Sequence, residues 1–140
     1  MNEIEALKAI IRKYEGCKLK AYYCPAGVLT IGWGATGKGI TPTTVWTQQQ
    51  ADERLHSDAI RVLVSTKKVV PNASGGFLVA LADFSYNLGL GRLLASTLRK
   101  RALENDLSGC AKELKKWVYA GGKKLDGLVK RRNTEISLFL

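Results

Sequence analysis

The stretch YEGCKLKAYYCPAGVLTIGWG, from Tyr14 to Gly34, contains the change of local structure that decides the fold. Gly16 stands where a helix would end. It is followed by two short runs, 18–23 and 28–33, which are rich in Tyr, Val, Ile and Thr, as extended strands are. The segment 24–27, Cys-Pro-Ala-Gly, has Pro and Gly where a tight turn favours them. The stretch therefore predicts a helix followed by a small antiparallel hairpin.

The residues before this stretch predict an amphipathic helix. Apolar side chains recur at intervals of three and four, at Ile4, Leu7, Ile11 and Tyr14. Asn2 is suited to cap the N-terminus of this helix, with Glu5 placed to accept the reciprocal hydrogen bond of a capping box. After the hairpin, four glycines between residues 32 and 39 predict a second turn, with room for a third short strand before Pro42. A sheet lobe over about residues 17–45 is therefore expected.

The rest of the chain has a helical pattern. Thr47 to Gln50 forms a capping-box signature, and apolar residues then recur at helical spacing. The segment Phe77–Leu88 is apolar on nearly every side, which predicts a helix that is buried all round and ended by Gly89 and Gly91. Further helices are expected over 96–105 and 108–117, capped by Ser96 and Ser108, and over 125–138 after a break at Gly121-Gly122.

The composition is that of an ordinary globular domain with an excess of positive charge. Of 140 residues, 46% are hydrophobic and 24% charged, and no apolar run reaches the roughly 18 residues of a membrane span. Twenty-two Lys and Arg against twelve Asp and Glu give a net charge of +10, which attracts nucleic acid, anionic membrane or acidic cell-wall polymer. We expect one domain over 1–140, of the α+β class and mostly helical, with a small antiparallel sheet and a larger helical bundle.

The cysteines and the single histidine argue against a metal site. Cys17, Cys24, Cys110 and His56 show no C-x-x-C or H-x-x-x-H spacing, so neither a metal nor another cofactor is expected. An odd cysteine count, in a chain that starts without a signal-peptide pattern, indicates reduced thiols. Cys17 and Cys110 are expected to be inert core residues, and His56 to lie on a helix surface.

Glu15 is the position where the residues themselves suggest acid chemistry. It lies at the C-terminal end of the first helix, where the helix dipole repels a carboxylate by roughly 0.3–1 kcal/mol and so favours the protonated form. A general acid must carry a proton near neutral pH. The alternative is a surface glutamate paired with Lys18 or Lys20, and position alone leaves both interpretations open.

Several motifs together resemble the phage lysozymes (endolysins) of glycoside hydrolase family 24. Glu15, Cys24 and Thr30 meet the family spacing of Glu, eight residues, Asp or Cys, five residues, then Thr. Other matching segments, in chain order, are LKAY at 19–22, TIGWG at 30–34, NLG at 87–89 and GLVKRR at 127–132. The resemblance covers almost the whole chain. It implies a lysozyme-like fold with a cleft between its two lobes, and hydrolysis of the β-1,4 bond between N-acetylmuramic acid and N-acetylglucosamine in peptidoglycan.

The resemblance also implies catalytic roles. Glu15 would protonate the glycosidic oxygen, while Cys24 and Thr30 would position or activate the attacking water, with inversion at the sugar. Cys24 departs from the Asp of many family members. A thiol is mostly protonated at neutral pH, but a nearby cation such as Lys20 would increase the thiolate fraction. Cys24 is then either a thiolate base or a covalent nucleophile, and a turn thiol with no role is the alternative.

Four further residues are candidates for binding the sugar polymer: Tyr86, Asn87, Trp117 and Arg131. Tyr86 and Asn87 end the buried helix, where the resemblance implies sugar-binding groups, although a helix-end Asn is also an ordinary cap. Trp117 fits a core position as well as a sugar platform. Arg131 or Arg132 is expected to pair with the catalytic acid, to meet carboxylates of the polymer, or to lie on a solvated helix face.

The expected function is that of a phage endolysin, a monomeric muramidase that degrades the host wall. Its expected partner is the peptidoglycan polysaccharide, with no nucleic acid and no stable membrane insertion. We expect it in the host cytoplasm until a holin pore releases it, unless an N-terminal export segment has been trimmed. The alternatives are an inactive wall-binding relative and a basic nucleic-acid-binding module, although the Lys and Arg residues are scattered rather than ordered along one helix.

Overall fold

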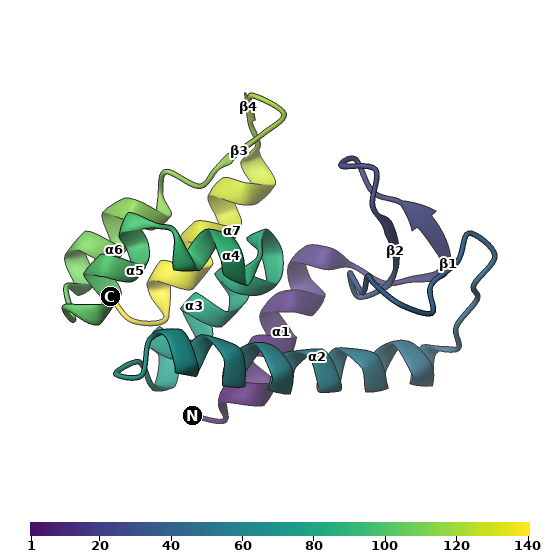
Figure 1. The fold of residues 1–140 in the computed structure, drawn as a ribbon, viewed down its shortest axis with the longest axis horizontal. Helices are drawn as coiled ribbons and strands as arrows, with labels where there is room; N and C mark the ends of the chain where they lie inside the picture. The colour runs from purple at the N-terminus through teal and green to yellow at the C-terminus, as the bar shows by residue number, and fades with distance from the viewer.

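The computed structural model describes residues 1–140 and places a small sheet lobe beside a larger helical lobe (Figure 1). The elements are α1 (Glu3–Glu15), β1 (Lys18–Tyr23), β2 (Leu29–Gly32), α2 (Gln48–Val69), α3 (Gly75–Leu88), α4 (Leu90–Leu94), α5 (Thr97–Leu103), α6 (Leu107–Leu114), β3 (Tyr119–Ala120), β4 (Lys123–Lys124) and α7 (Asp126–Ser137). The predicted α+β class, mostly helical with a small antiparallel sheet, is confirmed.

Helix α1 begins and ends where the sequence predicts. Asn2 Oδ1 accepts a hydrogen bond from the backbone N–H of Glu5 at 3.1 Å, while the Glu5 carboxylate binds Lys8 rather than answering the cap. Its buried residues are Leu7, Ile10 and Ile11. Gly16 has a φ of +68°, in the left-handed region that favours glycine, so the helix stops there and Glu15 is its last residue.

Strands β1 and β2 form the predicted antiparallel hairpin. Tyr22 pairs with Thr30, and the register is irregular nearer the start of β1. The backbone N–H of Cys24 donates to the carbonyl of Val28 at 2.9 Å and closes the turn. The hairpin therefore holds Cys24 and Thr30 on adjacent stretches of chain.

The prediction of a third strand before Pro42 is wrong. The chain makes turns there, and after Pro42 a single bridge joins Val45 to Lys20. Three glycines between residues 34 and 39 have positive φ angles, which interrupt an extended run.

Helix α2 runs along both lobes and connects them (Figure 1). The predicted capping box is confirmed: the Thr47 N–H donates to Gln50 Oε1 at 2.8 Å, and the Gln50 N–H donates to Thr47 Oγ1 at 3.1 Å. The helix buries the predicted apolar positions Ala51, Leu55, Ala59 and Val62.

Helix α3 is the centre of the helical lobe, as its sequence predicts. Every residue from Phe77 to Ser85 is buried. The helix begins at Gly75, two residues before the predicted start, and Gly89 ends it. Gly91 lies inside the short helix α4, which was not predicted because two glycines in three residues are typical of a loop.

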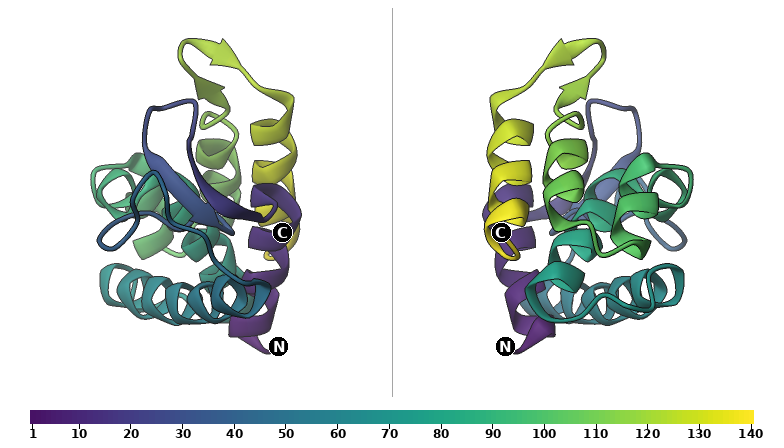
Figure 2. Two further views of the ribbon diagram at one scale, coloured as in Figure 1. Left: turned by 90° about the vertical axis from the view of Figure 1, so that its right-hand side faces the viewer. Right: turned by 90° about the vertical axis from the view of Figure 1, so that its left-hand side faces the viewer.

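In the C-terminal third, one predicted helix cap is confirmed, a second is wrong, and a hairpin is present that was not predicted. Ser96 Oγ accepts a hydrogen bond from the Arg99 N–H at 3.1 Å, as predicted. Helix α6 is capped by Asp106, which accepts from the Gly109 N–H at 2.9 Å, and not by Ser108. A carboxylate is at least as good a cap as a hydroxyl and is also favoured by the helix dipole. The missed hairpin, β3–β4, joins α6 to α7, which lie side by side (Figure 2).

All three cysteines are free thiols, as expected. Cys110 is fully buried, and burial raises its pKa to about 11. The core position expected for Cys17 is wrong, because this side chain is half-buried and its sulfur accepts a hydrogen bond from Gln48. His56 lies on the exposed face of α2 as predicted. None of the helices combines the length and the hydropathy that crossing a bilayer requires.

Candidate functional site

Glu15 lies where α1 meets both lobes. Its side chain keeps 24% of its surface exposed. On one side the loop after β2 passes against the carboxylate, since a Cβ on Gly34 would lie 2.8 Å from Glu15 Oε1. Gly34 also has a φ of +94°, so both backbone and space require glycine there.

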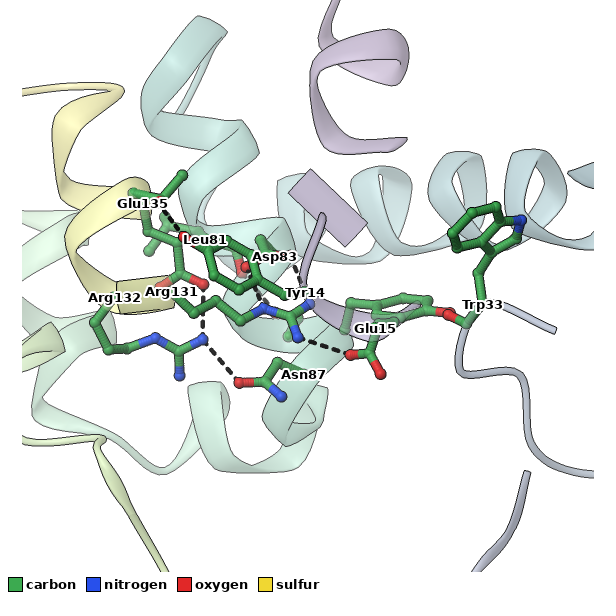
Figure 3. A network of polar contacts seen from close by, with 12 residues as sticks. Tyr14, Glu15, Trp33, Leu81, Asp83, Asn87, Arg131, Arg132 and Glu135 are labelled. Atoms are coloured by element: carbon green, nitrogen blue, oxygen red, sulfur yellow. Dashed lines mark hydrogen bonds and ion pairs between the residues drawn. The ribbon is translucent and has the colours of Figure 1, made fainter. Parts of the chain in front are cut away.

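Arg131 holds the other side of the Glu15 carboxylate (Figure 3). Its Nη1 donates to Glu15 Oε2 at 2.7 Å, while its Nε and Nη2 donate to the two oxygens of Asp83 at 2.9 and 2.8 Å. Asp83 is fully buried and Arg131 is 3% exposed. The bidentate pair fixes the plane of the guanidinium, and thereby the position of Glu15.

The structure decides between the alternatives left open for these two residues. Glu15 makes no ion pair with Lys18 or Lys20. Arg131 is not on a solvated face, and of the predicted alternatives the structure contains its pairing with Glu15. Because its three donor nitrogens are all engaged by protein carboxylates, direct binding of substrate by Arg131 stays a prediction.

Asp83 and Glu135 form a buried pair of acids with opposite pKa shifts. Burial raises the pKa of Asp83, but hydrogen bonds from Glu135 and Arg131 outweigh that effect and hold the pKa below its ordinary value. Burial, followed by the hydrogen bond to Asp83, raises the pKa of Glu135 well above its ordinary value. No donor lies within hydrogen-bond distance of Glu135 Oε1, while Oε2 accepts from Arg132 at 2.8 Å. The surroundings therefore favour the ionised form of Asp83, the partner of Arg131, whereas burial favours the protonated form of Glu135.

Arg132 connects this buried pair to the candidate Asn87. Its Nη2 donates to Asn87 Oδ1 and to Glu135 Oε2, both at 2.8 Å, and its guanidinium lies over the Phe84 ring. The amide oxygen of Asn87 is thus occupied and its amide nitrogen remains as a donor. The role of Asn87 in sugar binding stays a prediction.

Cys24 and Thr30 lie together in the hairpin. A hydrogen bond from the backbone of Val28 lowers the pKa of the Cys24 thiol, and further bonds from Ala26 and the Thr30 hydroxyl help to outweigh the opposing effect of burial. Lys20 is not among the causes, so the expected cation is wrong and backbone donors take its place. The single proton of the Thr30 hydroxyl is donated to the Val28 carbonyl, 2.9 Å away, or can turn toward the Cys24 sulfur.

Tyr22, on β1, is sensitive to the charges of both Glu15 and Cys24 and was not among the predicted site residues. Burial raises its pKa, and the negative charges of Glu15 and then of Cys24 raise it further. Such effects weaken with distance, so Tyr22 is close enough to Glu15 at the end of α1 and to Cys24 in the hairpin to be affected by both charges. Its aromatic ring on an exposed strand, two residues before Cys24, was the available signal.

Tyr86 connects α3 to the loop after β2. Its hydroxyl donates to the backbone carbonyl of Trp33 at 2.7 Å, and burial raises its pKa, with smaller contributions from the charges of Asp58 and Glu15. Trp33 is held in turn by Asp52 through its indole N–H. Contact between Tyr86 and a sugar stays a prediction.

Trp117 packs mainly against the core. Its ring meets that of Phe84 edge to face, with centroids 5.2 Å apart and planes at 87°. The side chain is half-buried, so the core interpretation of Trp117 is the better supported one.

Two hollows border the Glu15 site. One, of about 320 Å³, is lined by Tyr14, Glu15, Asn87, Leu125, Gly127, Leu128 and Arg131. The other, of about 240 Å³, is lined by residues of α2, by Tyr86 and by Gly34. Gly34 lines the second hollow and lies against the carboxylate of Glu15, which lines the first, so both hollows are adjacent to Glu15. No group of three or more potential metal ligands is present.

Comparison with known proteins identifies the family of the chain. A family model described as phage lysozyme matches residues 12–135. An endolysin of Acyrthosiphon pisum secondary endosymbiont phage 1 is 38% identical over 136 residues, which are 93% of this chain and 92% of that protein. A SAR-endolysin of bacteriophage PS119 is 37% identical over 125 residues, 86% of this chain and 73% of its own length.

A solved structure gives the same result for the fold. The muramidase domain of SpmX from Asticaccaulis excentricus superposes with a TM-score of 0.85 at 26% identity, covering 96% of this chain and 95% of that one. The lysozyme-like fold expected from the sequence is therefore confirmed. With the family model spanning most of its residues, this chain belongs to the phage lysozyme family.

Proposed function

We propose that this glycoside hydrolase of the phage lysozyme family cleaves the β-1,4 bond between N-acetylmuramic acid and N-acetylglucosamine in peptidoglycan, with Glu15 as its general acid. The observation that carries the proposal is the grip on Glu15: Arg131 binds Oε2, and Oε1 is left facing the loop at Gly34. An acid held by one oxygen presents the other to the glycosidic oxygen in a fixed position.

The water that completes the reaction would be held by the hairpin. Because the Thr30 hydroxyl donates to Val28, its lone pairs are free to accept a hydrogen bond from water. Cys24, whose thiol pKa is lowered by backbone donors, would take the proton of that water as a thiolate. An attack by the Cys24 sulfur on the sugar is the covalent alternative, and would replace inversion by retention.

The net positive charge of the protein matches the negative charge of a bacterial wall. A net charge of +10 draws the protein to the carboxylates and phosphates of a bacterial wall. We propose that residues 1–140 act as one monomeric catalytic domain on peptidoglycan, and that the protein reaches the wall from the host cytoplasm through a holin pore, without binding nucleic acid or inserting stably into the membrane.

The test is to identify the sugar at the new chain ends. Purified peptidoglycan is incubated with the protein, the new ends are reduced with borohydride, and the fragments are analysed by mass spectrometry. Reduced N-acetylmuramic acid is the expected product. Reduced N-acetylglucosamine alone would show a different glycosidase, and no new ends together with salt-sensitive DNA binding would replace the enzyme with a nucleic-acid-binding module.

A further inference from the structure

The second hollow beside Glu15 carries charge that no protein group neutralises. Its α2 wall presents Arg54, Asp58 and Arg61, two cations against one anion. Arg54 Nε lies 3.1 Å from both oxygens of Asp58, and Arg61 Nη2 lies 3.2 Å from one of them. One carboxylate thus serves two guanidinium groups, which leaves an excess of one positive charge.

The same guanidinium groups have unused donors. Arg54 spends its Nη2 on the carbonyl of Thr36 at 2.7 Å, and its Nη1 has no partner in the protein. Arg61 uses only Nη2, so its Nε and Nη1 are free, and its side chain is 64% exposed. The free Nε–H and Nη1–H groups of Arg61 point in different directions, so each can donate one charge-assisted hydrogen bond to an anion.

The hollow is next to the reacting centre. Gly34 forms part of its lining and also lies against Glu15 Oε1. Tyr86 lines it as well and responds to the charges of both Asp58 and Glu15. A group bound here would therefore be attached to a sugar close to the bond that Glu15 cleaves.

We propose that the hollow between Arg54, Arg61 and Tyr86 binds a carboxylate of the peptide stem that substitutes the glycan strand. The proposal rests on the proposed function, because it takes peptidoglycan as the substrate. A neutral sugar could accept hydrogen bonds from the same arginines, but only an anion removes the uncompensated charge. Arg61 would then determine which wall fragments bind well, without taking part in the chemistry.

The kinetic test compares two soluble glycan–peptide fragments that differ only in charge. In one the stem carboxylates are free, and in the other they are amidated. Arg61→Gln is expected to raise KM for the free-acid fragment about tenfold with kcat nearly unchanged, as the loss of one charge-assisted contact does. For the amidated fragment the wild type should already show the higher KM, and Arg61→Gln should change nothing further.

The matched control is Arg101→Gln. Arg101 pairs with Glu104, three residues later at the end of α5, as Arg61 pairs with Asp58, three residues earlier in α2. Arg101 is not part of the hollow. The control removes the same charge and should leave KM unchanged for both fragments. Arg61→Lys keeps the charge and loses the fixed directions of the guanidinium donors, so an intermediate KM is expected. An equal rise for both fragments, or no rise for either, overturns the proposal.

A binding measurement separates this proposal from the proposed function. Calorimetry with Glu15→Gln and with Glu15→Gln/Arg61→Gln records the affinity for both fragments without turnover. The single variant should prefer the free-acid fragment about tenfold, and the double variant should lose that preference. Equal preference in both variants contradicts the carboxylate site. A wild type that binds with this preference but releases no chain ends contradicts the proposed function alone.

Discussion

Glu15 and Arg131 are 116 residues apart in the chain, and their side chains meet at 2.7 Å. Arg131 is itself held by both oxygens of the buried Asp83. The candidate acid is therefore positioned by two linked ion pairs, Glu15 with Arg131 and Arg131 with Asp83, which connect α1 to α7 and α7 to α3. Each link can be tested separately.

Asp83→Asn should disrupt the position of Arg131 and leave it without one of its two charged partners. Removing one partner of a buried ion pair costs about 3–5 kcal/mol, so the free energy of unfolding should fall by that order. Activity should fall more than tenfold under conditions in which circular dichroism shows the variant folded. The control is Asp126→Asn, an exposed acid in the first turn of α7, which should change little. Full activity in folded Asp83→Asn would separate Asp83 from the site.

Glu135→Gln tests whether the pKa of the buried Glu135 carboxyl is raised on folding. The amide can still donate to Asp83 and accept from Arg132, so the variant should fold. A group whose pKa is raised on folding contributes stability below its unfolded pKa and loses that contribution as pH rises. The wild type should therefore lose stability relative to Glu135→Gln above the ordinary value of 4.5, by about 1.4 kcal/mol per pH unit until the raised pKa of Glu135 is reached.

Urea unfolding of both proteins between about pH 4.5 and about pH 8 measures this difference. Asp83, whose pKa is lowered, contributes a slope of the opposite sign, but only as pH falls through its own range, below the ordinary value of 3.8. Other titrating groups are common to both proteins and cancel in the difference. A difference that does not change with pH would show that Glu135 is ionised in the folded state.

Gly34→Ala should reduce activity through a single added methyl group. The new Cβ would lie 2.8 Å from Glu15 Oε1, so the carboxylate or the loop must move. Gly37→Ala is the matched control, because Gly37 also has a positive φ, +106°, and nothing lies within 4 Å of its Cβ position. Both variants should lose roughly 1–2 kcal/mol of stability from backbone strain. Only Gly34→Ala should lose activity, about a hundredfold, in an assay of reducing ends; equal losses would attribute the effect to strain.

The extent to which this site could be read from the sequence depends on the range of each interaction. The α1 cap at Asn2, the α2 capping box at Thr47 and the turn from Cys24 to Val28 are set by neighbours within four residues, and all were predictable. Glu15, Cys24 and Thr30 became candidates because their spacing resembles that of the phage lysozyme family. The failures at α4 and at the Asp106 cap are also local, and arose where glycine and two competing cap residues gave ambiguous signals.

The long-range part of the site could not be predicted. The apolar pattern around Asp83 does not indicate why a charged residue occurs in a buried helix, because its partners Arg131 and Glu135 come about fifty residues later. The sequence leaves three alternatives open for Arg131, and only the packing of α7 against α3 selects one of them. The backbone donors that lower the pKa of Cys24 depend on turn geometry, which composition does not reveal.

Cys24 should be the reactive thiol of this protein. Its pKa is lowered, whereas burial raises that of Cys110 to about 11. Iodoacetamide at neutral pH should therefore modify Cys24 before Cys110, as peptide mass spectrometry can record, and wall lysis should fall in parallel. Cys24→Asp should keep much of the activity because it retains an anion, while Cys24→Ser should lose most of it. Near-wild-type lysis by both variants would remove the thiol from the mechanism.

The most direct test of the account is the release of reducing ends from purified peptidoglycan by Glu15→Gln. The change keeps the shape of the side chain and removes its proton, so a difference reports chemistry rather than folding. The control is Glu53→Gln, an exposed residue of α2 whose carboxylate binds only Gln49. We expect release by the wild type and by Glu53→Gln, and a loss of at least a hundredfold in Glu15→Gln. Equal release by all three proteins would contradict the assignment of Glu15 as the catalytic acid.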